Sequence, residues 1–437
     1  MTAAPESAVL PKAFHRLWAA SCISYLGDGV YLAALPLLAA SLTRDPFTLG
    51  LVASGALLPS LFFSLPGGAL VDRWDRRRTM LIADLARGAL LAVPAVAMLL
   101  GWAGVQLLIV VAFCLGTAQI FFDTASSAYL PQLLDRDVDL LQQATARKFG
   151  AQTVASEFVG PPVGSLLFAL SRAVPFLANA LSFLASGVLI RTLPSQPVTP
   201  RTAKASLAAE IREGVAFVVR NRILLASALR FGMGNVAFMA GDAVLVLFAR
   251  ENLHLGNFGY GVLLTAQAVG GLAGTVLARL LGKWLRIGGA LILTAGVEAF
   301  AQLCLGLSTN AVEGALALIV TGAAMAATMV LGPSISQAIV PPALNGRVSA
   351  TNRLFAFGSA PLGAALGGYL GSVAGLRAPF LIGAALLAAV TLSTASLAPS
   401  REIEAVLAAA RARRNPGPVE ALAQTGGDDR QEVSSAT

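Results

Sequence analysis

The sequence is poor in charged residues, histidine and cysteine, and each scarcity excludes a class of protein. Charged residues make up 12% of the 437 residues and apolar residues 56%, whereas about a quarter of a typical soluble domain is charged. His15 and His254 are expected at opposite membrane faces, so they form neither a catalytic couple nor a metal-binding pair. Cys22, Cys114 and Cys304 are solitary within apolar stretches, which favours packing thiols over disulfides or metal ligands.

Long apolar runs dominate what the sequence does contain. A bilayer core of about 30 Å needs about 20 apolar residues per helix, and the mean hydropathy of the chain is +0.73. Twelve segments meet this criterion: Phe14 to Leu42, Phe47 to Val71, Thr79 to Leu100, Val105 to Tyr129, Lys148 to Leu170, Val174 to Leu193, Ile223 to Ala249, Tyr260 to Leu281, Ile287 to Leu307, Gly314 to Ile339, Val348 to Leu370 and Pro379 to Leu397. The first is too long for a signal peptide and has no clear cleavage site. The sequence therefore predicts an all-α integral membrane protein that contacts the lipid bilayer along most of its length.

The distribution of Lys and Arg predicts the orientation. If the N-terminus is cytoplasmic, 24 of the 31 Lys and Arg residues fall on the cytoplasmic side. The opposite loops hold only Arg44, Arg172, Arg250 and Arg377. This bias predicts a bacterial-type inner (plasma) membrane protein with both termini in the cytoplasm. It also accounts for the net charge of +8, and no basic stripe with interleaved aromatics indicates a nucleic-acid partner.

The longest internal hydrophilic stretch divides the twelve segments six and six. The predicted organisation is a six-helix bundle over residues 1–193, a cytoplasmic linker over 194–222, a second bundle over 223–400 and a largely disordered cytoplasmic tail over 401–437. Within the linker, LAAEIREGVAFVVRN has the pattern of an amphipathic surface helix. Pro162-Val163-Gly164 in the fifth segment is echoed by Pro361-Leu362-Gly363 in the eleventh, which predicts two pseudo-symmetric halves. The alternative is chance similarity between two helices rich in Ala, Gly and Pro.

A charged loop, defined here as residues 72–78 (DRWDRRR), separates the second and third segments. With the residues before it, this loop resembles the loop signature of the major facilitator superfamily, which is matched by Gly68, Leu70, Asp72, Arg73, Arg76 and Arg77. The fifth segment resembles the antiporter motif of that superfamily, through Gly160, Pro161, Pro162 and Gly164. Together with RLWAASCISYLGD, FFDTASSAYLP and GRVSATNR, these motifs resemble the macrolide-efflux and enterobactin-exporter branch.

The resemblance implies a function as well as a fold. It implies a monomeric secondary transporter, not an enzyme, that exports a small amphipathic compound by alternating access. An antibiotic or other drug is the first expected cargo and a siderophore the second. No glycine-rich phosphate-binding loop is present, so we expect no cofactor and a proton gradient as the energy source. A passive channel or a non-transporting receptor is the alternative from another class.

Three departures from the family pattern bear on this expectation. Asp75 stands where the loop signature usually has a second Gly. The fourth segment lacks the Arg that marks many proton-coupled drug antiporters, so export is better supported than proton coupling. The corresponding loop of the second half keeps its basic residues but has lost the acid.

Two groups of residues are candidates for function. The resemblance implies a cytoplasmic gate, in which Asp72 and the arginines Arg73, Arg76 and Arg77 interact with Asp123; the alternative is that the arginines only fix topology. Ionisable residues inside membrane segments cost about 2.5–3.5 kcal/mol each and mark functional sites. The candidates for contacting cargo or carrying a proton are Asp28, Asp242, Arg230, Glu157 and, less favoured, Glu298, with Tyr25, Tyr31, Gln119 and Asn235 as polar neighbours.

Each ionisable candidate also has a structural interpretation. Any of them can form an interhelical ion pair that only stabilises the fold, and Glu157 can pair across the interface between the halves. Arg230 and Asp242 are twelve residues apart, so they cannot pair on one straight helix. Asp84 and Arg87 stand three residues apart on one face of the third segment, which predicts a local ion pair.

Overall fold

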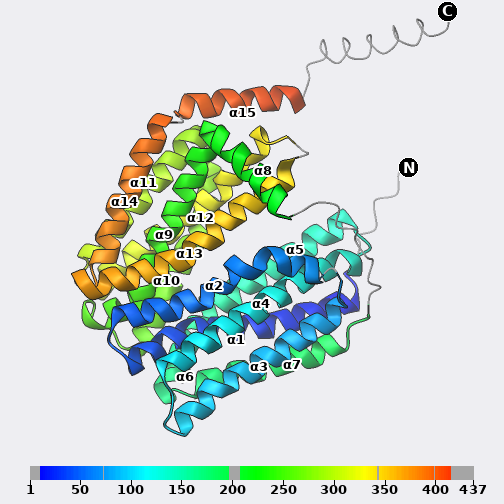
Figure 1. Cartoon of the computed structure of the whole chain (residues 1–437), viewed down its shortest axis with the longest axis vertical. Coiled ribbons are helices and arrows are strands. Elements are labelled where there is room, and N and C mark those ends of the chain that lie inside the picture. Colours follow the sequence, from blue (N-terminus) through cyan, green and yellow to red (C-terminus); the bar gives the residue numbers. More distant parts are fainter. Residues whose placement is uncertain (1–9, 72, 196–206, 342–343, 398, 415–437) are drawn as a thin grey trace, which may run out of the picture.

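A computed structural model describes residues 10–71, 73–195, 207–341, 344–397 and 399–414. Within these ranges the regular structure is helical throughout (Figure 1). The helices of the first half are α1 (Lys12–Leu42), α2 (Pro46–Val71), α3 (Arg76–Leu99), α4 (Val105–Leu133), α5 (Val138–Gln152), the π-helical turn η1 (Thr153–Val159), α6 (Gly160–Leu170) and α7 (Val174–Arg191). Those that follow are α8 (Leu207–Arg220), α9 (Arg222–Glu251), α10 (Asn257–Trp284), α11 (Arg286–Leu307), α12 (Ala311–Ile339), α13 (Asn345–Ala374), α14 (Ala378–Leu397) and α15 (Ser400–Arg414).

By length and composition, eleven helical stretches of the described part can cross a membrane, with α5, η1 and α6 counted as one continuous span. The 30-residue α13 occupies the place of the remaining predicted span. The prediction of an all-α membrane protein is therefore confirmed. The fifth span differs from expectation because its helix begins at Val138, ten residues before Lys148. Those ten residues mix polar and apolar side chains and form no continuous apolar run, although Asp137 caps the helix by accepting a hydrogen bond from the Leu140 amide at 2.9 Å.

The two halves of the chain pack their helices in the same pattern, as a duplicated fold requires. In the first half α1 packs on α6 and α7, α3 on α4 and α7, and α2 on α4. The second half repeats these pairs as α9 with α13 and α14, α11 with α12 and α14, and α10 with α12. The two most extensive contacts between the halves are also equivalent, because α2 packs on α13 and α10 packs on α6.

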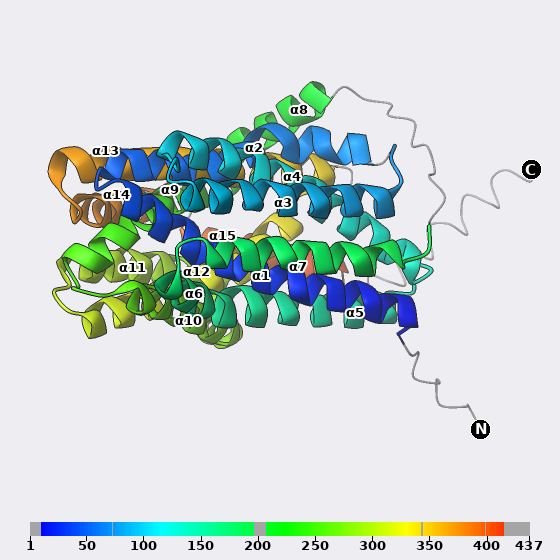
Figure 2. The same cartoon turned by 90° about the horizontal axis from the view of Figure 1, so that it is seen from below.

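The bundles meet at one end of the molecule, here named the closed end, where the α1–α2 and α9–α10 loops lie. One hydrophobic cluster at this end draws residues from both bundles, including Leu37, Phe176, Val244 and Phe380. Toward the other end, named the charged-loop end after residues 72–78, each cluster belongs to a single bundle. Figure 1 shows the ribbons converging at the closed end and separating toward the charged-loop end, and Figure 2 shows α2 near α13 and α6 near α10, the pairs that join the bundles.

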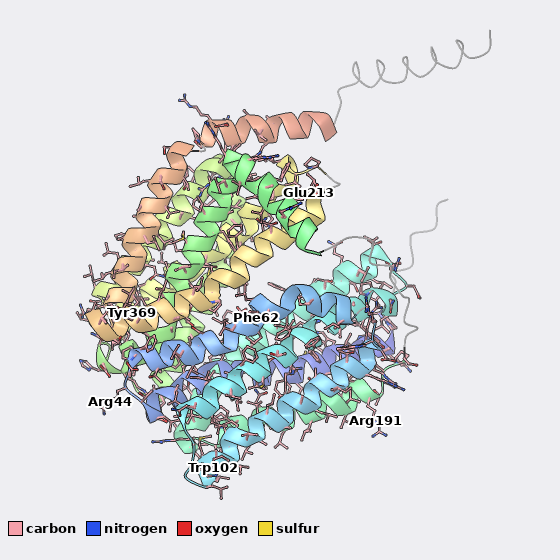
Figure 3. All side chains as sticks on the ribbon, viewed as in Figure 1. Arg44, Phe62, Trp102, Arg191, Glu213 and Tyr369 are labelled. Carbon is pink, nitrogen blue, oxygen red and sulfur yellow. The ribbon has the colours of Figure 1, made fainter. Side chains whose placement is uncertain are left out.

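Figure 3 marks the two ends by labelled side chains. Arg44 and Tyr369 stand at the closed end, one on each bundle, and Arg191 of the first bundle and Glu213 of α8 stand at the charged-loop end. Phe62 of α2 lies between the bundles and is 57% exposed. The structure is therefore joined at one end and splayed at the other.

Two helices outside the bundles lie at the charged-loop end of the second half. α8 packs against α13 and α9, and its Val218 is buried with Leu224 and Val348. α15 packs against α11 and α12 and buries Ile403 and Leu407. The start of the expected tail is thus a docked helix, while residues 415–437 and 196–206 lie outside the described part.

Candidate functional site

The charged loop is held by its own residues and by the end of α7. The Asp75 carboxylate caps α3 by accepting a hydrogen bond from the Arg78 amide at 2.9 Å, which explains how an acid replaces Gly here. Arg77 donates a hydrogen bond from Nη1 to the Leu193 carbonyl at 2.8 Å. Arg73 is exposed, and a Cβ at Gly68 would meet no atom within 4 Å. Asp72, predicted as the acid of the gate, lies outside the described residues.

A chain of polar side chains runs through the first bundle from α3 to α4. Arg87 of α3 is 1% exposed, forms an ion pair with Asp84 and donates to the Gln119 amide oxygen. Gln119 in turn donates from Nε2 to Asp123 Oδ2 at 3.0 Å. Asp123, predicted as the gate partner of the arginines, is therefore bonded here to Gln119 of its own helix. Among the described residues, no ion pair joins Asp123 to Arg73 or Arg77.

Two aromatic rings enclose the Arg87 guanidinium. Its Cζ lies 4.3 Å from the centroid of the Phe122 ring and 4.1 Å from that of the Phe183 ring. Cation–π contacts of this kind are worth about 2 kcal/mol when desolvated. The sequence indicates the pair of Asp84 and Arg87 but not these rings, because ring placement depends on how α4 and α7 rotate against α3.

Asp28 of α1 sits beside this chain at a close helix crossing. Its neighbour Gly27 approaches Asn179 and Ser182 of α7, and Gly29 approaches Gly160, so larger residues would overlap them. The Asp28 side chain is half-buried and has no hydrogen bond or ion pair with a described residue. Arg87, Asp84 and Asp123 are close enough to act on it electrostatically.

Two other predicted polar neighbours stand on α1 with Asp28. Tyr25 is 5% exposed and lies within electrostatic range of Asp28 and Asp123. Tyr31 also lies within electrostatic range of Asp28. Its hydroxyl has no hydrogen-bond partner among the described residues, and its ring packs edge-on against Phe176 with centroids 6.3 Å apart. The structure therefore gathers Tyr25, Asp28, Gln119 and Asp123 around Arg87, and we name these five residues the N-bundle cluster.

The antiporter-like motif packs between the two bundles. Gly160 lies against Gly29, and Gly164 against the Val30 carbonyl of α1, so both close contacts exclude a side chain. Pro162 lacks the N–H group that would donate to the Phe158 carbonyl. The Thr265 hydroxyl of α10, in the other bundle, lies 3.3 Å from that carbonyl. Glu157, in η1, is exposed and has no ion pair with a described residue, contrary to the suggested pairing across the interface.

The candidates in the second bundle fall in three separate places on α9. Asn235 donates from Nδ2 to Ser359 Oγ of α13 at 2.9 Å. Asp242 lies nearer the closed end, within electrostatic range of Tyr260, and has no hydrogen bond with a described residue. Gly363 contacts the Val236 carbonyl in the second bundle as Gly164 contacts the Val30 carbonyl in the first, so Val236 is the counterpart of Val30. The counterpart of Asp28 is therefore Gly234, and not Asp242. Arg230 faces a cavity inside the second bundle, together with Glu298.

A duplicated pair of six-helix bundles with ionisable residues inside its membrane spans defines a membrane transport protein. The family model described as "Transmembrane secretion effector" matches residues 3–427. The chain therefore belongs to this family of the major facilitator superfamily, in agreement with the resemblance of its motifs.

Named relatives and solved structures agree with this membership. The multidrug efflux pump Tap of Mycolicibacterium fortuitum is 29% identical over 373 residues, covering 81% of this chain and 88% of that protein. Macrolide efflux protein A of Streptococcus pyogenes is 24% identical over 279 residues, 62% of this chain and 67% of that protein.

Solved transporters share the fold at low sequence identity. The nucleoside transporter NupG superposes with a TM-score of 0.73 at 16% identity, covering 89% of this chain and 99% of that one. A bacterial homologue of the iron transporter ferroportin, in its inward-facing state, gives a TM-score of 0.73 at 13% identity, covering 89% and 99%. At these identities the likeness concerns the fold alone.

Proposed function

We propose that this protein exports a small amphipathic compound, an antibiotic or other drug in the first instance, across a bacterial inner membrane. Two relatives carry the names multidrug efflux pump and macrolide efflux protein, which supports an efflux role. The observation that carries the proposal is the closure of the two bundles at one end only. Asp28, an acid that pairs with no residue in the described ranges, lies on a helix that contacts both bundles.

The bias of Lys and Arg supports a cytoplasmic position for the charged-loop end. With that orientation the structure is open toward the cytoplasm and closed toward the outside. Export by alternating access needs a second state, in which the closed end separates and the charged-loop end closes. Reporter fusions after Arg44 and after Arg414 test the orientation, because only the second should report from the cytoplasm.

Closure of the charged-loop end would use the gate residues. In the present conformation the Asp123 carboxylate accepts a hydrogen bond from Gln119. Closing of the charged-loop end therefore requires Asp123 to exchange that bond for contacts with the loop arginines. Exposed ion pairs contribute about 0–1 kcal/mol each. Several of them, made together by Asp72, Arg73, Arg76 and Arg77, are therefore needed to bias the equilibrium.

Transport of a labelled macrolide tests the export itself. Protein would be reconstituted into vesicles with the charged-loop end outward, and accumulation measured with and without an imposed pH gradient. Saturable, gradient-dependent uptake into these vesicles, equivalent to export from cells, supports the proposal. Net uptake by intact cells contradicts it, and flux that neither saturates nor responds to the gradient indicates a channel. A labelled siderophore in a parallel arm decides between the two cargo classes.

A further inference from the structure

A cavity of about 460 Å³ lies inside the second bundle, apart from the N-bundle cluster. Its walls come from α9, α11, α12, α13 and α14, which all belong to one bundle in Figure 1. The volume falls within the range of about 300–1,000 Å³ that small-molecule sites occupy. The walls are mainly apolar, for example Leu291, Pro333 and Leu387.

Two opposite charges face this cavity without meeting each other. Glu298 of α11 is 6% exposed, and no hydrogen bond or ion pair joins it to a described residue. Arg230 of α9 has a buried Nη1 group that forms no hydrogen bond with any of the described residues. A buried charge or donor without a partner is costly, by about 1–3 kcal/mol for a neutral donor and more for a charged one.

The helix geometry explains why the two charges stay apart. The Glu298 carboxylate approaches Gly234, with Oε1 4.0 Å from the position of a Cβ there. Arg230 stands one turn before Gly234, and side chains on a helix tilt toward its N-terminus. The guanidinium therefore points away from Glu298, toward the charged-loop end, and the charges occupy different depths of one cavity.

The mouth of the cavity opens beside two exposed apolar side chains. Met329 of α12 is 48% exposed and Phe355 of α13 is 37% exposed, whereas Leu291 and Leu387 deeper inside are 5% and 3% exposed. A ligand thus enters past Met329 and Phe355 and meets apolar walls before it is enclosed.

We propose that this cavity binds an amphipathic molecule that carries both a cationic and an anionic group, with Glu298 receiving the cation and Arg230 the anion. Such a ligand supplies both missing partners at once, and its apolar body fits the walls. The proposal rests on the proposed export function, because it names the charge class of the exported compound. Binding is measured without transport, so the two proposals can fail separately.

Rhodamine B and its ethyl ester are suitable probes, because both are cationic and only the first also carries a carboxylate. Fluorescence anisotropy of the full chain in detergent gives both dissociation constants. We expect rhodamine B to bind about tenfold more tightly than the ester. Arg230→Gln should remove this preference by weakening rhodamine B alone, and Glu298→Gln should weaken both probes about tenfold. Glu402→Gln, an exposed acid of α15, should change neither constant.

A steric variant tests the location independently of charge. Gly332 of α12 lines the cavity, and a Cβ there would meet nothing within 4 Å. Gly332→Leu should fill the cavity and abolish binding of both probes, whereas Gly296→Leu, equally free of neighbours but outside the cavity, should not. Absence of saturable rhodamine B binding, or constants unchanged by both Glu298→Gln and Gly332→Leu, overturns the proposal. If export persists unchanged in these variants, the cavity is not the cargo site, and the proposed export function is unaffected.

Discussion

The Ser54 hydroxyl of α2 donates a hydrogen bond to the Pro361 carbonyl of α13 across the interface between the bundles, at 2.9 Å. Ser54 is 5% exposed, so water does not compete for this bond. Beside this bond, Gly50 of α2 and Gly368 of α13 face each other, and the two backbones are so close that a side chain at either position would overlap the other helix. The closed end is therefore held by close backbone contact and by specific hydrogen bonds, in addition to the hydrophobic cluster that both bundles share.

Replacing Ser54 by Ala should shift the molecule toward separation of the closed end. The lost hydrogen bond contributes about 0.5–1.5 kcal/mol, enough to change the ratio of two conformations several-fold. Spin labels at Arg44 and Glu251, exposed residues of different bundles at the closed end, would report a larger population of long distances, after the three native cysteines are replaced. Ser41→Ala, which removes a bond within α1 only, should leave the distribution as it was.

Gly164→Ala should destabilise the first bundle. A Cβ at this position overlaps the Val30 carbonyl, and backbone cannot give way as a flexible side chain can. Overpacking of this kind costs about 1–3 kcal/mol, so the unfolding temperature in detergent should fall. Gly150→Ala, in the same continuous span with nothing within 4 Å of its Cβ, should raise it slightly, since Ala favours a helix over Gly by about 1 kcal/mol. Equal effects of both variants would contradict the close crossing.

Arg87→Met should be strongly destabilising because it leaves Asp84, which is 0% exposed, without its cation. Breaking a buried pair by removing one partner costs about 3–5 kcal/mol. The double variant Arg87→Met with Asp84→Asn should recover part of that loss, which thermal unfolding can measure. A double variant no more stable than Arg87→Met alone would show that the two rings and Gln119, rather than Asp84, hold the arginine.

The long apolar runs predicted the spans, and the loop signature with the antiporter-like motif predicted the superfamily. The repeat of Pro162-Val163-Gly164 as Pro361-Leu362-Gly363 predicted the pseudo-symmetric halves. The contents of the N-bundle cluster were not predictable, because membership depends on helix rotation: Asp123 was assigned to the gate, yet its carboxylate meets Gln119. The sequence also could not show which residue of α9 corresponds to Asp28, because that requires the structural alignment given by the crossings at Val30 and Val236, and the counterpart is Gly234, not Asp242.

Asp28→Asn should remove the dependence of transport on the pH gradient if Asp28 carries the coupled proton. Asparagine is close in size to the acid but cannot exchange a proton, so vesicles containing this variant should transport macrolide equally with and without the gradient. Asp45→Asn is the matched control, because this loop carboxylate caps α2 and Asn caps equally well. The hydrogen bond from Thr48 holds the pKa of Asp45 below its usual value, so it stays charged at neutral pH. Unchanged pH dependence in Asp28→Asn would remove that residue from the proton role.

Asp75 offers a graded test of why this chain departs from the loop signature. Its carboxylate caps α3 through the Arg78 amide, and its backbone carbonyl accepts from the Thr79 hydroxyl. Asp75→Asn should keep the cap, Asp75→Gly should cost a few tenths of a kcal/mol, and Asp75→Ala about 1 kcal/mol. Thermal unfolding of the three variants should follow that order. If Asp75→Asn instead slows transport while leaving the unfolding temperature unchanged, the Asp75 charge itself takes part in closing the charged-loop end, and capping alone does not explain the substitution.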